Sequence, residues 1–206
     1  MSKVVDLQYF GNSIYYLNLN YGTHVVFDQY VSYNKRNFSN RCIIAGANGP
    51  LYLTVPLKKG RTQRTVFKDV LVANEENWQV KHWKSIVSCY SGSPWFGFYA
   101  DSLSALYTKI FRFLLDWNLA CLDWSLMKLN LDVKYGLTSE YKSTYPEPEI
   151  GDNSDVHFTK AAGETGGYIY YKQIFEEKTG FIPNLSILDL LFCEGPSNTR
   201  RLLQRL

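Results

Sequence analysis

The chain has 206 residues, of which 46% are hydrophobic and 20% are charged. It can therefore bury a real core, which excludes a disordered chain, a collagen-like repeat and a disulfide-stapled miniprotein. The formal net charge is +3, and the charges are scattered along the chain instead of forming a stripe, so nucleic acid is not an expected partner. A single domain over residues 1–206 is expected.

The most apolar stretch, residues 103–131, carries five charged side chains, so it indicates a core helical region and not a membrane span. The first twelve residues lack the basic segment, apolar run and cleavage site of a secretory signal. These features predict a cytoplasmic protein. The four Cys and three His are not spaced as a zinc site, and nucleotide-binding signatures are absent, so we expect no metal and no cofactor.

The N-terminal residues predict a strand, a helix and a second strand. Residues 4–10 read as a short strand, the apolar spacing of residues 14–21 is typical of a helix, and residues 23–27 are β-branched and aromatic. The connection between the predicted helix and the second strand is short, which favours a parallel pair of strands joined by a right-handed crossover. Asp28 would then lie at the carboxyl end of a strand, where open α/β sheets bind ligands.

A β-hairpin is expected next. Residues 42–45 and 51–57 resemble strands, and the Asn48-Gly49 step between them supplies the positive φ angles of a tight turn. Pro56 cannot donate to a ladder, so the second arm should end there or lie at a sheet edge. Residues 66–72 read as one more strand.

Helices dominate the remainder of the chain. We expect a helix that begins near Asn74 and ends at residues 91–94, and a longer helical region over residues 101–131 that is broken once. Little periodicity over residues 137–167 predicts a long, mobile loop.

Two further helices are expected near the C-terminus. One covers residues 168–179, and a shorter one follows a Ser186/Asp189 capping box and ends at residues 195–196. The predicted fold is therefore α/β: an N-terminal strand–helix–strand unit and a hairpin, with a mainly helical C-terminal half packed on them.

Several sequence runs, taken together and in order, resemble the WbqC-like protein family. The runs are QYF at 8–10, Tyr33 with Lys35, NRCIIAGANGPLYLTVPL at 40–57, NWQVKHWKSIVSCYSGSPWFGFY at 77–99, LLDWN at 114–118 and GFIPNLSILDLLFCEGP at 180–196. They cover nearly the whole chain, so they are more specific than any short motif. Family members tend to have a Pro-containing segment before the QYF-like run, whereas this chain has residues Val4–Leu7 there.

The resemblance implies a bacterial protein from surface-polysaccharide, or O-antigen, gene clusters. The implied activity is a transferase that acts on an activated sugar, such as a nucleotide-sugar. Transfer of a glycyl or other aminoacyl group onto an amino sugar is one reaction of this kind that the resemblance implies. The implied partner is thus a small molecule, a nucleotide-sugar or an aminoacyl substrate.

Four residues are the predicted substrate-binding set. Asn40 and Arg41 follow a basic loop that contains Lys35, and a guanidinium can bind carboxylate or phosphate in a forked arrangement while Lys adds a compact charge. The resemblance covers these positions and adds Tyr33. The alternative is a solvated loop with an internal ion pair.

His82 and Asp28 are the predicted catalytic residues. His82 shares a helix face with Trp78 and Cys89 and could act as a general base near neutral pH, or it could be a core histidine that donates to a carbonyl. Asp28 could orient or deprotonate a group, or cap a turn. Cys42 beside Arg41 could be a low-pKa nucleophile or a packed thiol.

A second hypothesis assigns the protein a binding or assembly role without chemistry. It predicts a stable complex, such as a homodimer, in which partly exposed aromatic side chains act as anchors. The anchors would be Trp83, Trp95, Phe96, Phe98 and Tyr99.

Overall fold

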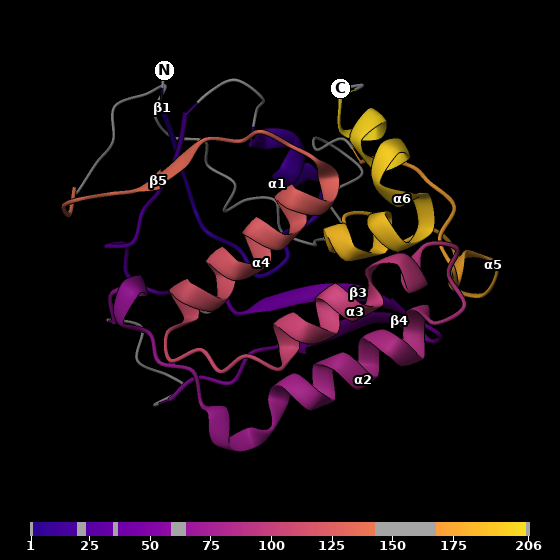
Figure 1. Ribbon diagram of the computed structural model, residues 1–206, viewed down its shortest axis with the longest axis horizontal. Coiled ribbons are helices and arrows are strands. Elements are labelled where there is room, and N and C mark those ends of the chain that lie inside the picture. The colour runs from indigo at the N-terminus through magenta and orange to yellow at the C-terminus, as the bar shows by residue number, and fades with distance from the viewer. Residues whose placement is uncertain (1, 20–23, 35–36, 59–64, 143–167, 205–206) are drawn as a thin grey trace.

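A computed structural model describes residues 2–19, 24–34, 37–58, 65–142 and 168–204 (Figure 1). The predicted loop over 137–167 therefore lies mostly outside the described residues. The elements, in chain order, are β1 (Ser2–Val5), α1 (Ser13–Asn18), β2 (His24–Phe27), β3 (Arg41–Gly46), β4 (Gly49–Thr54), the 3-10 helices η1 (Phe67–Asp69) and η2 (Asn74–Glu76), α2 (Trp78–Tyr90), α3 (Phe96–Tyr107), α4 (Leu114–Leu129), β5 (Tyr135–Leu137), α5 (Glu176–Thr179) and α6 (Ile187–Leu203).

The predicted strand–helix–strand order is confirmed, although the first strand covers Ser2–Val5 instead of residues 4–10. Strands β1 and β2 pair in parallel, with Val4 opposite Val26, and α1 connects them. Strand β5 adds to the free side of β2, also in parallel, with Val25 opposite Tyr135. Sequence reasoning missed β5 because it has only three residues, one of them Gly136.

The predicted hairpin is also confirmed, with a shorter second arm. Strands β3 and β4 are antiparallel from Arg41 opposite Thr54 to Gly46 opposite Gly49. Gly49 has φ of 117°, the left-handed region that Gly adopts without steric cost. The second strand ends at Thr54, two residues before Pro56.

Three helices form the centre of the chain, and Figure 1 shows α2 beside the hairpin, where it contacts β3. The expected break within residues 101–131 separates α3 from α4. Asn77 and Asn130, both with positive φ, precede α2 and follow α4. Asn74 opens η2 instead of capping α2.

Two sequence-based assignments are wrong. Residues 66–72 form η1 and isolated bridges, Ser32 with Val66 and Leu57 with Val72, instead of a strand. Residues 168–175 are not helical, and of the predicted helix only α5 forms. The alternation of exposed and buried side chains from Tyr168 to Gln173 is the period of two of an extended chain.

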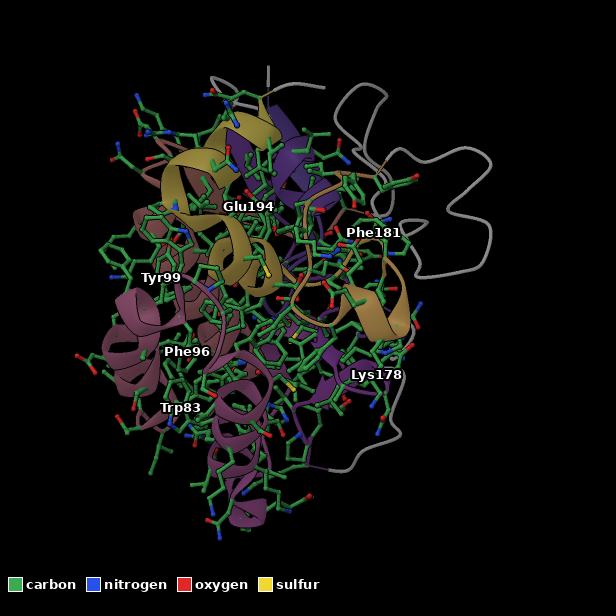
Figure 2. All side chains as sticks on the ribbon, turned by 90° about the vertical axis from the view of Figure 1, so that its right-hand side faces the viewer. Trp83, Phe96, Tyr99, Lys178, Phe181 and Glu194 are labelled. Atoms are coloured by element: carbon green, nitrogen blue, oxygen red, sulfur yellow. The ribbon has the colours of Figure 1, made fainter. Side chains whose placement is uncertain are left out.

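Aromatic side chains make up much of the core. The buried Trp117 ring lies 5.0 Å from Trp78, 5.2 Å from Tyr107 and 5.5 Å from Tyr9, measured between centroids. A second group lies where α2 and α3 meet α6. Figure 2 shows Trp83, Phe96 and Tyr99 in a column along these helices, and Phe96 lies 6.0 Å from Trp83. Within the described residues, no helix has the length and apolar character needed to cross a bilayer.

Candidate functional site

A pocket of about 310 Å³ lies where the two strands of the hairpin end away from the turn. It brings together three of the four predicted substrate-binding residues with the segment that follows β4. Its lining residues are Tyr33, Asn40, Arg41, Thr54, Val55, Pro56 and Leu57.

Backbone pairing holds the pocket walls together. The Val55 N–H donates to the Asn40 carbonyl at 2.7 Å, and the Asn40 side-chain amide donates to the Val55 carbonyl at 3.1 Å. Pro56, the next residue of the wall, is bonded to a residue that does not line the pocket, because the Ala73 N–H donates to the Pro56 carbonyl at 2.9 Å. These hydrogen bonds order the walls before any ligand binds, which lowers the entropy cost of binding.

Arg41 and Tyr33 give the pocket its chemistry. The Arg41 guanidinium lies 5.3 Å from the centroid of the Phe38 ring, which restricts its orientation. Burial raises the pKa of the Tyr33 hydroxyl, while the Arg41 charge opposes this rise, so the phenol is a neutral donor at physiological pH. None of the seven described lining residues is acidic. This set of groups suits a carboxylate or phosphoryl oxygen.

His82 is not among the residues that line the pocket. It is buried, with 7% of the residue exposed, and its Nδ1 lies 3.0 Å from the Tyr9 hydroxyl. Burial is the largest cause that lowers the pKa of His82 to about 4. The imidazole is therefore neutral at physiological pH. Its predicted role as a general base stays a prediction.

Asp28 follows β2, as predicted, and its carboxylate binds nearby groups of the protein. It accepts from the Tyr30 N–H at 2.9 Å and from the Thr138 hydroxyl at 3.2 Å. This is the geometry of a side chain that caps a turn and joins β2 to the end of β5. Asp28 is not among the residues that line the pocket, and its catalytic role likewise stays a prediction.

Two other candidates remain. Lys35 lies outside the described residues, so its predicted role in substrate binding stays a prediction. Cys42 is buried in β3, and burial raises the pKa of its thiol. A raised pKa is the opposite of what a thiolate nucleophile requires, so Cys42 is a packed thiol.

Sequence reasoning missed two parts of the site. Residues 54–57 form one wall of the pocket. The only sequence signal for this was their position in run 40–57, one of the runs on which the family resemblance rests. Asn118, fully buried in α4, donates from its side-chain amide to the Ser39 carbonyl at 2.7 Å and to the Leu7 carbonyl at 3.4 Å. It thereby connects the segment before Asn40 to the β1–α1 connection. The sequence signal for this role was an amide side chain within an otherwise apolar helix, because a buried amide needs hydrogen-bond partners.

No described residues form a metal site. Among them, no group of three or more His, Cys, Asp or Glu side chains is close enough to hold an ion. The four cysteines are free thiols, and three of them, at positions 42, 89 and 121, are buried.

Comparisons with known proteins show which family the chain belongs to. A curated relative from Mycobacterium tuberculosis (strain ATCC 25618 / H37Rv), "Uncharacterized protein Rv1507c", is 26% identical over 200 residues that cover 83% of each chain. No solved structure matches the chain. The family profile that matches residues 9–150 is described as "WbqC-like protein family". Since this match includes the hairpin, the pocket and His82, the chain belongs to the WbqC-like protein family.

Proposed function

We propose that the pocket at the end of the hairpin binds the anionic group of an activated sugar, and that the protein is a transferase of surface-polysaccharide assembly. The observation that carries the proposal is the convergence of Tyr33, Asn40 and Arg41 on one pocket, none of whose described lining residues is acidic. Family membership supports it. The polysaccharide role comes from the family resemblance alone.

The size of the pocket indicates how much of a substrate it takes. Pockets for small molecules begin at about 300 Å³, so a pocket of about 310 Å³ suits a phosphoryl or carboxylate group with part of its neighbour. The apolar wall of Val55, Pro56 and Leu57 can contact that neighbour. We therefore propose that one end of a nucleotide-sugar, or the carboxylate of an aminoacyl substrate, binds here.

In an aminoacyl transfer, the amine nitrogen of the sugar would attack the carbonyl carbon of an activated acyl ester or thioester. The new C–N bond forms while the bond from that carbon to its oxygen or sulfur leaving group breaks. The amine then gives up one proton. His82 and Asp28 are the predicted acceptors for that proton, although neither lines the pocket.

Ligand-induced stabilisation of wild-type and Arg41→Ala protein tests the proposal. UDP-N-acetylglucosamine, UDP-glucose, inorganic pyrophosphate and glycine are the probes. A bound probe at 100 times its Kd stabilises the folded state by about 2.7 kcal/mol, which raises Tm by a few degrees. Because a hydrogen bond to a charged group contributes roughly 1.5–3 kcal/mol, Arg41→Ala should weaken binding about 10- to 100-fold.

Arg112→Ala is the matched control. Its guanidinium also lies over a phenyl ring, 5.2 Å from the Phe113 centroid, but Arg112 does not line the pocket. Binding of pyrophosphate without glycine would identify a phosphoryl site, and the reverse a carboxylate site. No thermal shift from any probe would contradict the proposal.

An exposed pair of aromatic residues favours a second candidate function, that of a binding or assembly protein. Trp95 and Phe98 are 39% and 64% exposed, and their ring centroids are 6.2 Å apart. The other three predicted anchors are less available, since Phe96 and Tyr99 are buried and Trp83 is half-buried. This pair could contact a second copy of the chain.

A further inference from the structure

Asn118 is a polar side chain at a fully buried position of α4. Its Nδ2 donates to the Ser39 carbonyl at 2.7 Å and, more weakly, to the Leu7 carbonyl at 3.4 Å. Its Oδ1 is also buried and has no hydrogen-bond partner among the described residues. Because a buried acceptor without a partner costs free energy, the presence of an amide here is explained by what its Nδ2 donor holds in place.

The Ser39 carbonyl gives Asn118 an effect on the pocket. Ser39 is buried and comes directly before Asn40 and Arg41, which both line the pocket. The peptide unit is planar, so a hydrogen bond that fixes the Ser39 carbonyl also fixes the plane of the peptide between Ser39 and Asn40. The direction in which the chain enters the pocket is therefore set from α4.

The ring on which Arg41 lies is held in the same segment. The Arg41 guanidinium lies 5.3 Å from the centroid of the Phe38 ring, and the Phe38 carbonyl accepts from the Tyr9 N–H at 3.1 Å. The Asn118 bond is the middle one of three consecutive attachments, between those of Phe38 and Asn40. Of the three, it alone is supplied by a side chain outside the pocket, so a substitution can remove it without changing a lining residue.

From these contacts we infer that Asn118 is a positioning residue of the pocket, which acts on the ligand through Arg41 by fixing the peptide between Ser39 and Asn40. The inference rests on the proposed function, since the pocket must bind an anionic group for the orientation of Arg41 to matter. Asn118 is not itself among the lining residues. Its removal should therefore weaken binding without removing any group that the ligand contacts.

Affinity for UDP-N-acetylglucosamine, measured by calorimetry on folded variants, tests the inference. Asn118→Leu is close in size to the wild-type side chain and has no donor, so the Ser39 carbonyl loses its partner and the peptide can turn. We expect binding about 5-fold weaker, which corresponds to about 1 kcal/mol for one hydrogen bond. If the pocket binds glycine and not the nucleotide-sugar, glycine is the probe in the same comparison.

Asn118→Asp is the conservative variant that should restore binding. Burial favours the neutral form of the new carboxyl, and a neutral carboxyl can donate one hydrogen bond to the Ser39 carbonyl, so affinity should lie within about 2-fold of wild type at about pH 6. As the pH rises and the carboxyl ionises, this donor is lost. The affinity relative to wild type should then fall towards that of Asn118→Leu, whereas a merely structural role would leave this ratio unchanged.

Ser125→Ala is the matched control. Ser125 is also fully buried in α4, and its hydroxyl also donates to a backbone carbonyl, that of Cys121, at 2.8 Å. That bond lies within the helix and does not reach the segment before the pocket. Its loss should leave affinity for the probe unchanged even if the protein becomes less stable.

The Nε–H resonance of Arg41 in the ligand-free protein gives a second readout. It is identified by its absence from the spectrum of Arg41→Ala, and its chemical shift reports the position of the guanidinium beside the Phe38 ring. The resonance should move in Asn118→Leu and stay in place in Ser125→Ala. An unmoved resonance in folded Asn118→Leu would overturn the inference.

The outcomes separate the two proposals. If wild-type protein binds the probe and Arg41→Ala does not, while folded Asn118→Leu binds as tightly as wild type, the positioning role is wrong and the proposed function stands. Equal losses in Asn118→Leu and Ser125→Ala would also overturn the positioning role. If Asn118→Leu does not fold, Asn118→Asp decides, and an affinity ratio that stays constant while carbon-13 NMR shows the carboxyl ionising would overturn it. If wild-type protein binds none of the probes, the proposed function fails and the positioning role fails with it.

Discussion

Asp189 is a buried carboxylate with two tyrosine partners. Its oxygens accept from the Tyr90 hydroxyl at 2.5 Å and from the Tyr171 hydroxyl at 2.6 Å. The sequence predicts a capping box with Ser186, and only half of it forms. Ser186 caps α6 by accepting from the Leu188 N–H, but its own N–H donates to the Ile43 carbonyl of β3, so Asp189 is available for the tyrosines.

Asp189 makes stability depend on pH. Burial raises its pKa to about 6 from an ordinary 3.8, although both tyrosine hydrogen bonds oppose the rise. Because the folded state holds this proton more tightly than the unfolded state, the contribution is complete below pH 4 and is lost as the pH rises through about 6. At about 1.4 kcal/mol per pH unit, the loss amounts to about 3 kcal/mol. Urea unfolding from pH 4 to 7.5 measures it.

Asp189→Asn is the informative variant for this measurement. It cannot ionise, so the fall in unfolding free energy between pH 4 and 6 should largely disappear. Asp116→Asn is the control, because this first-turn carboxylate of α4 is exposed. An Asp189→Asn protein that keeps the wild-type pH profile would show that other groups cause the dependence.

Sequence identifies residue types at the site better than it identifies their roles. The pattern marks Tyr33 and Arg41, in and just after the basic loop, and both line the pocket. The partners of His82 and Asp28 could not be predicted, because Tyr9 and Thr138 are distant in the chain, 73 and 110 residues away. Only the folded chain shows that these partners already hold both side chains.

At the scale of elements, α6 is interrupted at a glycine. Gly195 has φ of 73° and divides the helix, and Pro196 follows it. The sequence marks this position as a helix end, but the chain returns to helix as far as Leu203. A Cβ at Gly195 would overlap the Trp95 ring, so close approach and positive φ both require Gly here.

Gly195→Ala should therefore destabilise the protein. Positive φ costs an L-residue roughly 1–2 kcal/mol, and displacement of the Trp95 ring adds to this, so we expect a loss of about 2–4 kcal/mol in urea unfolding. Gly97→Ala is the matched control. Its Cβ would meet nothing within 4 Å, so Ala in this first turn of α3 should leave the free energy of unfolding unchanged or slightly higher. Equal effects of the two substitutions would contradict this account.

Elements with a strong local signal were predictable, and elements set by tertiary contacts were not. The hairpin follows from Asn48-Gly49 between two apolar runs. Residues 66–72 have β-branched composition but pair only at isolated bridges, because η1 turns the chain after Val66. Residues 168–173 are extended because their buried side chains, such as Ile169 and Tyr171, face the core at every second position.

At the scale of the whole molecule, the predicted α/β arrangement of an N-terminal sheet and hairpin with a helical second half is confirmed. The pocket was not predictable as a shape, because it needs Tyr33 beside the two ends of the hairpin. That neighbour relation depends on a tertiary contact, in which the Tyr33 N–H donates to the Thr65 carbonyl at 2.9 Å.

The aromatic pair on the surface supplies a prediction at this scale. If Trp95 and Phe98 contact a second copy, light scattering should detect a homodimer, and Phe98→Ser should shift it towards monomer because a large apolar contact is lost. Ile110→Ser is the control, since Ile110 is more exposed, at 81%, but lies outside the pair. A wild-type monomer at high concentration would exclude the homodimer.

The parallel sheet also bears on how fast the chain can fold. Its central strand, β2, pairs on one side with a strand more than a hundred residues further along the chain, as Val25 opposite Tyr135 shows. Contacts of such long sequence separation slow folding, because a large loop must close before the contact forms. The three central helices lie within that loop, so they can form before β5 docks. Closure of the sheet is then a late event in folding, and β2 keeps an unpaired edge until it occurs.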